Sequence, residues 1–232
     1  MNDELDTSAA RAAIMQRIRA AQRRPATATA EELAAVEEYL ARHPAGPRPA
    51  IEGDLRIRFR AMSERMSSTV DEVPHLADAP AAVARYLDAQ QLPRKAAIWP
   101  TLASLDWAAA GVEVEARPAR RDMPPGGDAV GITGCFCAFA ETGTIVLASS
   151  AQTPSSTHLL PDTHIALVPA SRIVAGMEDV FALLRAERGG AQMMPRALNM
   201  VSGPSRTGDI ELTIVLGAHG PYRVHIVLAT ED

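Results

Sequence analysis

A ten-residue block near the C-terminal end of the chain carries the residue types best suited to binding chemistry. It reads Ser-Gly-Pro-Ser-Arg-Thr-Gly-Asp-Ile-Glu and spans residues 202–211. Apolar Leu198, Met200 and Val201 lead into it, which predicts a buried strand that ends in a loop. Glycines let the backbone approach a ligand closely, and an arginine pairs with a carboxylate or phosphate through two hydrogen bonds. The block therefore suits an anion site, although its polar residues could equally satisfy one another in a tight chain reversal.

A second turn follows, with the sequence Gly-Ala-His-Gly-Pro at residues 217–221. Its His219 could donate a proton or simply complete the hydrogen bonds of the turn. The six histidines show no i, i+4 pairing, so we expect no helical metal site. Cys135 and Cys137 would share one face of a strand, but two thiols cannot complete a four-ligand zinc or iron–sulfur site. We interpret both cysteines as small, half-buried hydrophobic residues.

Short apolar strands alternate with helices from Ser68 onward. Strands are expected at residues 68–70, 96–99, 112–116, 129–133, 144–148, 164–169, 197–201 and 222–229, and helices at 80–90, 102–110 and 177–188. This alternation is typical of an α/β fold whose parallel sheet is covered on both faces. Residues 54–66 fit either a strand or a helix, and their length favours a helix. For residues 207–216, β-branched side chains favour a strand, whereas acidic residues near the start and Gly217 at the end favour a helix.

The first 48 residues are expected to form a helical appendage to an α/β domain at residues 49–232. A helix from Ser8 to about Arg24 carries a narrow apolar stripe among many arginines. Thr29 and Glu32 have the spacing of a capping box that begins a second helix. The proline-rich stretch 43–49 then predicts a stiff linker. The arginine-rich helix suits either a solvated surface or an arm that docks a partner.

Composition excludes several classes of function. The chain has 232 residues, 47% of them hydrophobic and only 4% aromatic, so a large, mainly aliphatic core is expected. The net charge of −5 argues against a nucleic-acid partner. The apolar runs are too short to span a bilayer, and the acidic start differs from a signal peptide, which predicts a cytoplasmic location. The chain has no G-x-G-x-x-G fingerprint, so neither a dinucleotide nor another cofactor is expected.

Three blocks together resemble the LUD domain of the lactate-utilisation protein C family. They are the Ala-Glu-Thr-Gly-Thr run at 140–144, the block at 202–211 and the turn at 217–221, in this order. The resemblance runs from about Ser63 to the end and extends to the arginine-rich N-terminal helix. It implies a three-layer sandwich with a mostly parallel sheet, like that of glucosamine-phosphate deaminase, ribose-phosphate isomerase and the CoA transferases.

The resemblance also implies a set of site residues. The candidate catalytic residues are Glu141 and His219, and the candidate ligand-binding residues are Thr142, Gly143, Gly203, Ser205, Arg206, Thr207, Asp209 and Gly220. In the family's fold residues 207–216 would be helical, which would place the block's hydroxyls and arginine at a helix N-terminus that favours anions. Glu141 follows a strand, so it could lie at a sheet's carboxyl edge, and relatives with this fold use a carboxylate as base or nucleophile. Alternatively, Glu141 pairs with Arg206 and holds two loops together.

The function implied by the resemblance is a part in the oxidation of L-lactate to pyruvate beside iron–sulfur partner proteins, with a small anionic metabolite as ligand. A stand-alone enzyme of the CoA-transferase or phosphosugar type remains an alternative. It would use Glu141 and an anion cradle at Ser205, Arg206 and Thr207. If the chain oxidises lactate, the electrons must pass to something that it does not bind through thiolates. This consideration favours the subunit over the stand-alone enzyme.

Overall fold

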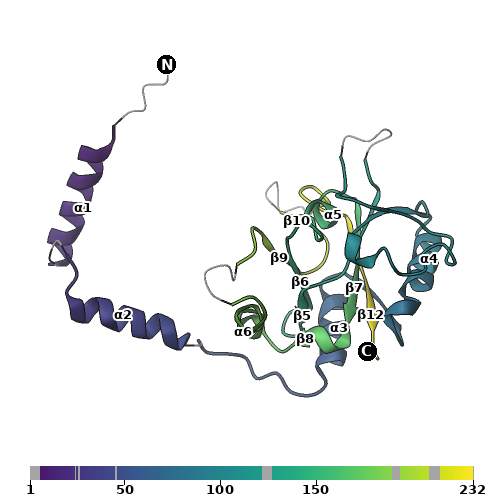
Figure 1. The fold of residues 1–232 in the computed structure, drawn as a ribbon, viewed down its shortest axis with the longest axis horizontal. Coiled ribbons are helices and arrows are strands. Elements are labelled where there is room, and N and C mark those ends of the chain that lie inside the picture. Colours follow the sequence, from purple (N-terminus) through teal and green to yellow (C-terminus); the bar gives the residue numbers. More distant parts are fainter. Residues whose placement is uncertain are drawn as a thin grey trace. The chain divides into compact units, whose positions relative to one another are not determined.

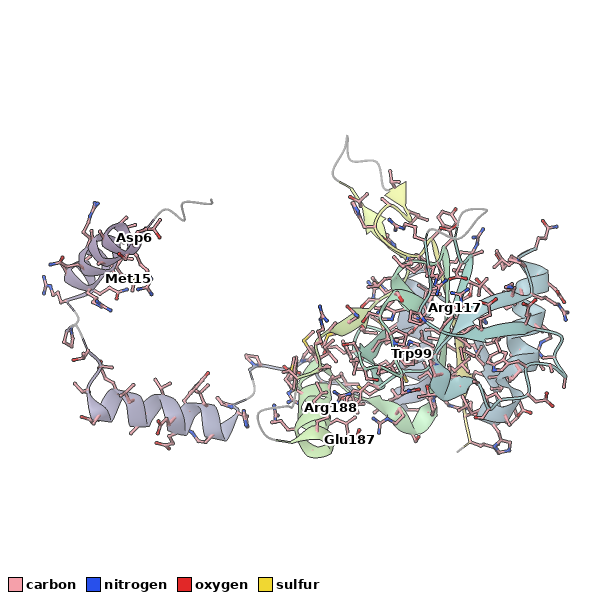
Figure 2. All side chains as sticks on the ribbon, turned by 45° about the horizontal axis from the view of Figure 1, so that its top comes forward. Asp6, Met15, Trp99, Arg117, Glu187 and Arg188 are labelled. Carbon is pink, nitrogen blue, oxygen red and sulfur yellow. The ribbon has the colours of Figure 1, made fainter. Side chains whose placement is uncertain are left out.

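The structure is a computed structural model that describes residues 6–23, 25, 27–44, 46–121, 127–189, 194–208 and 215–231. The chain divides into two compact units, Met1–Pro49 and Ala50–Asp232. The first contains helices α1 (Ser8–Gln22) and α2 (Ala30–Arg42), and neither helix buries a residue (Figure 1). Side chains stand out along α1, on which Met15 is labelled in Figure 2.

The predicted capping box begins α2. The Thr29 Oγ1 accepts a hydrogen bond of 3.2 Å from the Glu32 N–H, and the Glu32 carboxylate accepts one of 2.9 Å from the Thr29 N–H. These bonds satisfy backbone donors that a helix N-terminus otherwise leaves unpaired. The start of α2 is therefore fixed by local sequence alone.

A six-stranded parallel sheet forms the centre of the second unit. Its strands lie in the order β1 (Thr69–Val73), β12 (Arg223–Ala229), β7 (Thr163–Pro169), β4 (Val130–Thr133), β2 (Lys95–Ile98) and β3 (Glu113–Ala116). Every neighbouring pair in this sheet is parallel. Strands β7 and β12 are interior strands of the sheet and are buried along nearly their whole length, as expected for a sheet covered on both faces. The predicted α/β class is confirmed.

Helices cover both faces of this sheet. Helix α4 (Ala79–Ala89) packs on β1 and β12, where the ring of Tyr86 stacks on that of His225 at 3.8 Å. Register partners on parallel strands point to one side, and His164 pairs with Val224, so His164 faces away from α4. Helix α5 (Ser156–Leu159) contacts β4 and β7. It lies so close to β4 that a Cβ on Gly131 would meet the Thr157 carbonyl oxygen at 1.9 Å.

A second, four-stranded sheet packs beside the first and was not anticipated from the sequence. Its order is β8 (Ile173–Val174), β5 (Cys137–Phe139), β6 (Thr144–Ala148) and β9 (Leu198–Val201). The β5–β6 and β6–β9 pairs are antiparallel, and the β5–β8 pair is parallel. Helix α6 (Met177–Arg188) covers one face through Val180 and Leu184. Ala138 and Ile145 on the other face join the main core.

The ambiguous stretch 54–66 is a helix, as its length favoured. Helix α3 (Leu55–Arg65) begins at Asp54, whose carboxylate accepts hydrogen bonds from the Arg56 and Ile57 N–H groups at 2.8 and 3.4 Å. Phe59 is completely buried and anchors the helix in the main core. The aspartate cap and one buried aromatic residue therefore favour the helix over the strand at residues 54–66.

The helix predicted at residues 102–110 is wrong. The structure has a short 3₁₀ helix, Pro100–Leu102, followed by turns. Buried Trp107 donates its indole N–H to the Leu102 carbonyl oxygen at 2.9 Å, and the Asp106 carboxylate accepts from the Ala109 N–H at 3.0 Å. Side chains thus take up hydrogen bonds that a helix would make along its backbone. Trp99, labelled in Figure 2, is buried just before this segment.

The helix that the family resemblance implied at residues 207–216 is also wrong at both of its described ends. Strands β10 (Arg206–Thr207) and β11 (Val215–Leu216) pair in an antiparallel ladder, with Arg206 opposite Leu216. Residues 209–214, which include the candidate Asp209, lie outside the part that the structure describes. The β-branched residues that favoured a strand were the better guide here.

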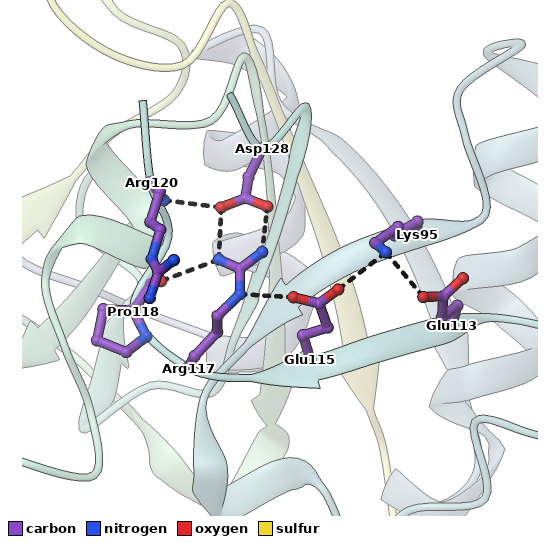
Figure 3. A network of polar contacts seen from close by, with 7 residues as sticks. All are labelled: Lys95, Glu113, Glu115, Arg117, Pro118, Arg120 and Asp128. Atoms are coloured by element: carbon purple, nitrogen blue, oxygen red, sulfur yellow. Dashed lines mark hydrogen bonds and ion pairs between the residues drawn. The ribbon is translucent and has the colours of Figure 1, made fainter. Parts of the chain in front are cut away.

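A chain of ion pairs braces the edge strand β3 (Figure 3). The Lys95 ammonium on β2 lies 2.8 Å from the carboxylates of both Glu113 and Glu115. Arg117 contacts Glu115 at 2.6 Å and holds Asp128 through two hydrogen bonds of 2.7 and 2.8 Å. Hydrogen bonds from the Arg117 guanidinium lower the pKa of Asp128. The pair therefore fastens together two positions eleven residues apart in the chain.

Three buried histidines make the stability of the domain depend on pH. His158, His164 and His225 are nearly inaccessible to solvent, and burial lowers the pKa of His158 and His225 to about 4 and that of His164 to about 3. In the unfolded chain each would titrate near its usual value of about 6.5. The unfolded state therefore binds more protons between these values. Each histidine should lower the free energy of unfolding by about 1.4 kcal/mol per pH unit as the pH falls from about 6.5 towards 4.

Urea unfolding between pH 7.5 and 4.5 measures this slope. His158→Leu should reduce the slope of the free energy of unfolding against pH by the contribution of one histidine. Neither ring nitrogen of His158 has a hydrogen-bond partner within the described part of the chain, so the substitution breaks no hydrogen bond. Equal slopes in the wild type and His158→Leu would contradict the prediction.

Candidate ligand pocket at the end of helix α3

Two glycine turns from distant parts of the sequence pack against the last turns of α3. Gly143 and Gly203 have positive φ angles of +66° and +83°. A Cβ on Gly143 would lie 2.3 Å from the Ser63 backbone nitrogen, and one on Gly203 would lie 2.1 Å from the Met66 carbonyl oxygen. Both turns therefore need glycine for their backbone angles and for their close approach to the helix.

Arg206 stabilises the same end of α3. Its guanidinium donates hydrogen bonds to the Met66 carbonyl oxygen and to the Ser67 hydroxyl, the latter at 2.8 Å. Carbonyl groups at a helix C-terminus carry partial negative charge, which a cation complements. No ion pair joins Arg206 to Glu141, both of which the structure describes. Arg206 thus closes the end of a helix, and the proposed cradle at a helix N-terminus is not formed, because residues 206–207 are a strand.

Glu141 lies at the start of α6. Its backbone N–H donates to the Ala175 carbonyl oxygen at 3.0 Å. Its carboxylate lies 3.1 Å from the point where a Cβ on Gly176 would be, and the carboxylates of Glu178 and Asp179 lie near the same point. The positive end of a helix dipole favours such carboxylates. The strand before Glu141 is β5 of the small sheet, so Glu141 is not at the carboxyl edge of the parallel sheet.

The two C-terminal turns meet at Ser205. Its N–H donates to the Pro221 carbonyl oxygen and its carbonyl accepts from the Gly217 N–H, both at 2.9 Å. A Cβ on Gly220 would lie 3.4 Å from that of Ser205. His219 is exposed on this turn, and no side-chain partner for it is found in the described ranges. These hydrogen bonds join the two turns, but the structure does not bring Glu141 and His219 together around Arg206.

A cavity of about 490 Å³ opens beside the end of α3, and we call it the α3 pocket. It is lined by Met62, Arg65, Met66, Phe139, Thr142, Thr144, Met177, Met200 and Ser202. The Thr142 and Thr144 hydroxyl oxygens are 2.5 Å apart, and those of Thr144 and Ser202 are 2.6 Å apart. A largely apolar wall with a few converging polar groups is the usual form of a small-molecule site.

The three hydroxyls form a row that can serve a ligand in two ways. Each hydroxyl has one hydrogen to donate and lone pairs that accept. When the two bonds within the row point the same way, they use two of the three hydrogens, and the hydroxyl at one end keeps the third. Either oxygen of each pair can be the donor, so the row can point in either direction. One end of the row therefore offers a donor or an acceptor as the ligand requires. Arg65 supplies the one cationic side chain in the lining.

Sequence reasoning found part of this pocket. Thr142 is a lining residue, and Gly143 and Gly203 shape the turns around it. Arg65 and the four methionines were missed, although Met62 and Met66 lie four residues apart on the apolar side of α3. The cysteines of β5 and of the segment before it lie outside the lining, and burial raises the pKa of both thiols to about 12.

A solved structure shares this architecture. The crystal structure of a DUF162 family protein from Deinococcus radiodurans superposes with a TM-score of 0.53 and covers 78% of this chain and 99% of that chain. The sequence identity is 24%, so the likeness shows the fold. No helix in the described part of the chain is long and apolar enough to cross a membrane.

The LUD domain matches residues 26–229, and the chain belongs to this family, as its motifs predicted. Lactate utilization protein C of Bacillus subtilis is 39% identical over 102 residues, which are 44% of this chain and 42% of that protein. The protein of the same name from Bacillus licheniformis is 37% identical over 102 residues with the same coverage. That from Bacillus velezensis is 33% identical over 135 residues, 56% of each chain. The chain thus matches about half the length of these relatives.

Replacing either close-packed glycine should destabilise the domain. Gly143→Ala and Gly203→Ala each combine a positive φ with a backbone clash, so we expect a loss of about 2–4 kcal/mol in the free energy of unfolding. Gly134→Ala is the matched control, because a Cβ there would have its nearest neighbours at 3.9 Å. Urea unfolding of the three variants measures the difference. Losses of similar size in all three variants would show that the contact with α3 is not the cause.

Proposed function

We propose that this chain is a lactate-utilisation protein that binds a small 2-hydroxy or 2-oxo acid in the α3 pocket. We further propose that it works beside separate iron–sulfur proteins that carry the electrons. The names of the relatives support a role in lactate utilisation. The observation that carries the proposal is the row of hydroxyls at Thr142, Thr144 and Ser202, set in an apolar pocket with one arginine.

The reversible row suits both members of the lactate and pyruvate pair. The hydroxyl of lactate can donate to the row, whereas the carbonyl of pyruvate accepts from it. Arg65 would pair with the carboxylate that both acids share, since a guanidinium matches a carboxylate through two parallel hydrogen bonds. The methyl group would lie against the methionine side chains, which adapt readily to irregular surfaces.

The electrons of lactate oxidation need an acceptor outside the two thiols of this chain. Conversion of lactate to pyruvate releases two electrons and two protons. An iron–sulfur cluster takes four ligands, usually cysteine thiolates, and this sequence has two cysteines, whose pKa values burial raises. Partner proteins that hold clusters would supply the acceptor. The stand-alone CoA-transferase-like alternative gains no support, since Glu141 lies beside α6 and outside the lining of the pocket.

Removing the guanidinium of Arg65 should weaken acid binding. A charge-assisted hydrogen bond contributes about 1.5–3 kcal/mol, so Arg65→Ala should raise the dissociation constant for pyruvate or lactate roughly tenfold to a hundredfold. Arg65→Lys should restore only part of the affinity, because the planar fork is lost. Calorimetric titration of the full chain, alone and with its co-purifying proteins, gives these constants.

Arg60→Ala is the matched control on the same helix. Arg60 is bonded to Glu64 and Glu72 and lies outside the pocket lining, so its removal should leave the dissociation constant unchanged. If wild-type protein binds neither acid in either setting, the proposed function fails. Equal binding by the wild type and Arg65→Ala would place the site elsewhere.

A further inference from the structure

A second cavity lies at the other end of the small sheet. It has a volume of about 590 Å³, and we call it the Arg196 pocket. It is lined by Ser149, Ser150, Ala151, Pro154, Ser155, Arg196 and Ala197. Ser149 follows β6 and Ala197 precedes β9, whereas the α3 pocket takes residues from the opposite ends of these paired strands. At about 3.4 Å per residue the two cavities are roughly 15 Å apart.

The loop that forms one wall satisfies most of its own hydrogen bonds. The Thr153 hydroxyl donates to the Ala148 carbonyl oxygen at 2.7 Å. In the 2.8 Å contact between the Ser150 and Thr153 hydroxyls, Ser150 must therefore be the donor. Ser150 also accepts from the Gln152 N–H at 3.1 Å. The loop is thus held in shape without a ligand, and the hydrogen of Ser150 is used.

Two other hydroxyls keep a free hydrogen. The Ser149 hydroxyl oxygen accepts from the Ala197 N–H at 2.8 Å, and that of Ser155 accepts from the Asn199 side-chain amide at 3.3 Å. Both hydroxyls act as acceptors in these contacts. Neither has an acceptor for its own hydrogen among the residues that the structure describes. Ser149 and Ser155 therefore present two donors to the cavity.

Arg196 adds a guanidinium that has no ion-pair or hydrogen-bond partner among the described residues. Two other arginines of this domain have partners: Arg117 pairs with Glu115 and Asp128, and Arg172 pairs with Glu187 and the Phe136 carbonyl oxygen. Arg196 is exposed and makes no hydrogen bond or ion pair within the described ranges. No carboxylate lines the cavity. An arginine that served only to brace the fold would show such partners.

We propose that the Arg196 pocket is a second binding site, which takes the oxyanion group, phosphate or carboxylate, of a metabolite. A wall with surplus N–H and O–H donors and no carboxylate attracts a group that only accepts hydrogen bonds and carries negative charge. Ala151, Pro154 and Ala197 provide apolar surface for the carbon skeleton that bears this group. The site differs in position and residues from the α3 pocket and does not depend on it.

Titration of the full chain at low ionic strength tests this proposal, because salt screens an exposed arginine. Inorganic phosphate and acetate are the two probes. We expect at least one to bind, and Arg196→Ala to weaken it about tenfold or more, with partial recovery in Arg196→Lys. Ser155→Ala should cause a smaller loss. Binding of phosphate alone assigns the site to phosphate esters, whereas equal binding of acetate assigns it to carboxylates.

Controls separate this site from the α3 pocket. Arg188→Ala removes another exposed arginine, at the end of α6 in Figure 2, and should leave probe binding unchanged. Arg196→Ala should leave the affinity for pyruvate at the α3 pocket unchanged, so the two proposals can fail separately. Because Arg196 is exposed, the variant should keep its wild-type melting temperature. Absence of binding by both probes, or equal binding by the wild type and Arg196→Ala, would overturn the proposal.

Discussion

The close packing of two glycine turns on the last turns of α3 is the contact on which the rest of the candidate site depends. Gly143 lies in the turn before β6 and Gly203 in the turn after β9, and both approach the backbone at the end of α3. Arg206 then closes the helix end through the Met66 carbonyl oxygen. This packing fixes the positions of Thr142 and Ser202, which flank the glycines. The pocket is therefore a consequence of how the small sheet docks on α3.

Much of the fold could be predicted from the sequence, because its signals are local. The buried strands of the parallel sheet are continuous apolar runs, and helices α4 and α6 lie close to where periodicity placed them. The small sheet could not be foreseen as a separate layer. Strand β5 has three residues, Cys137–Phe139, which is too short to show a period. Residues 102–110 have an apolar pattern that fits a helix, but tertiary packing of Trp107 gives turns instead.

The sequence analysis named one residue of the α3 pocket lining, Thr142, and two glycines of the turns beside it. The other predicted site residues that the structure describes lie outside the lining. The partner of Arg206 could not be predicted, since the acceptor at Met66 lies 140 residues away in sequence and is a backbone carbonyl. Arg65 is one of several arginines on α3, and only the fold shows which of them faces a cavity. The division into an appendage at residues 1–48 and a domain at 49–232 stays a prediction, and the family match begins at residue 26.

The central claim is that the α3 pocket binds a small 2-hydroxy or 2-oxo acid, and methionine-methyl NMR tests it most directly. The chain has nine methionines, of which Met62, Met66, Met177 and Met200 line the pocket. Titration of ¹³C-methyl-labelled protein with pyruvate should shift these four resonances along one common binding curve. Four unmoved pocket resonances at saturating pyruvate, with the partner proteins present, would contradict the account.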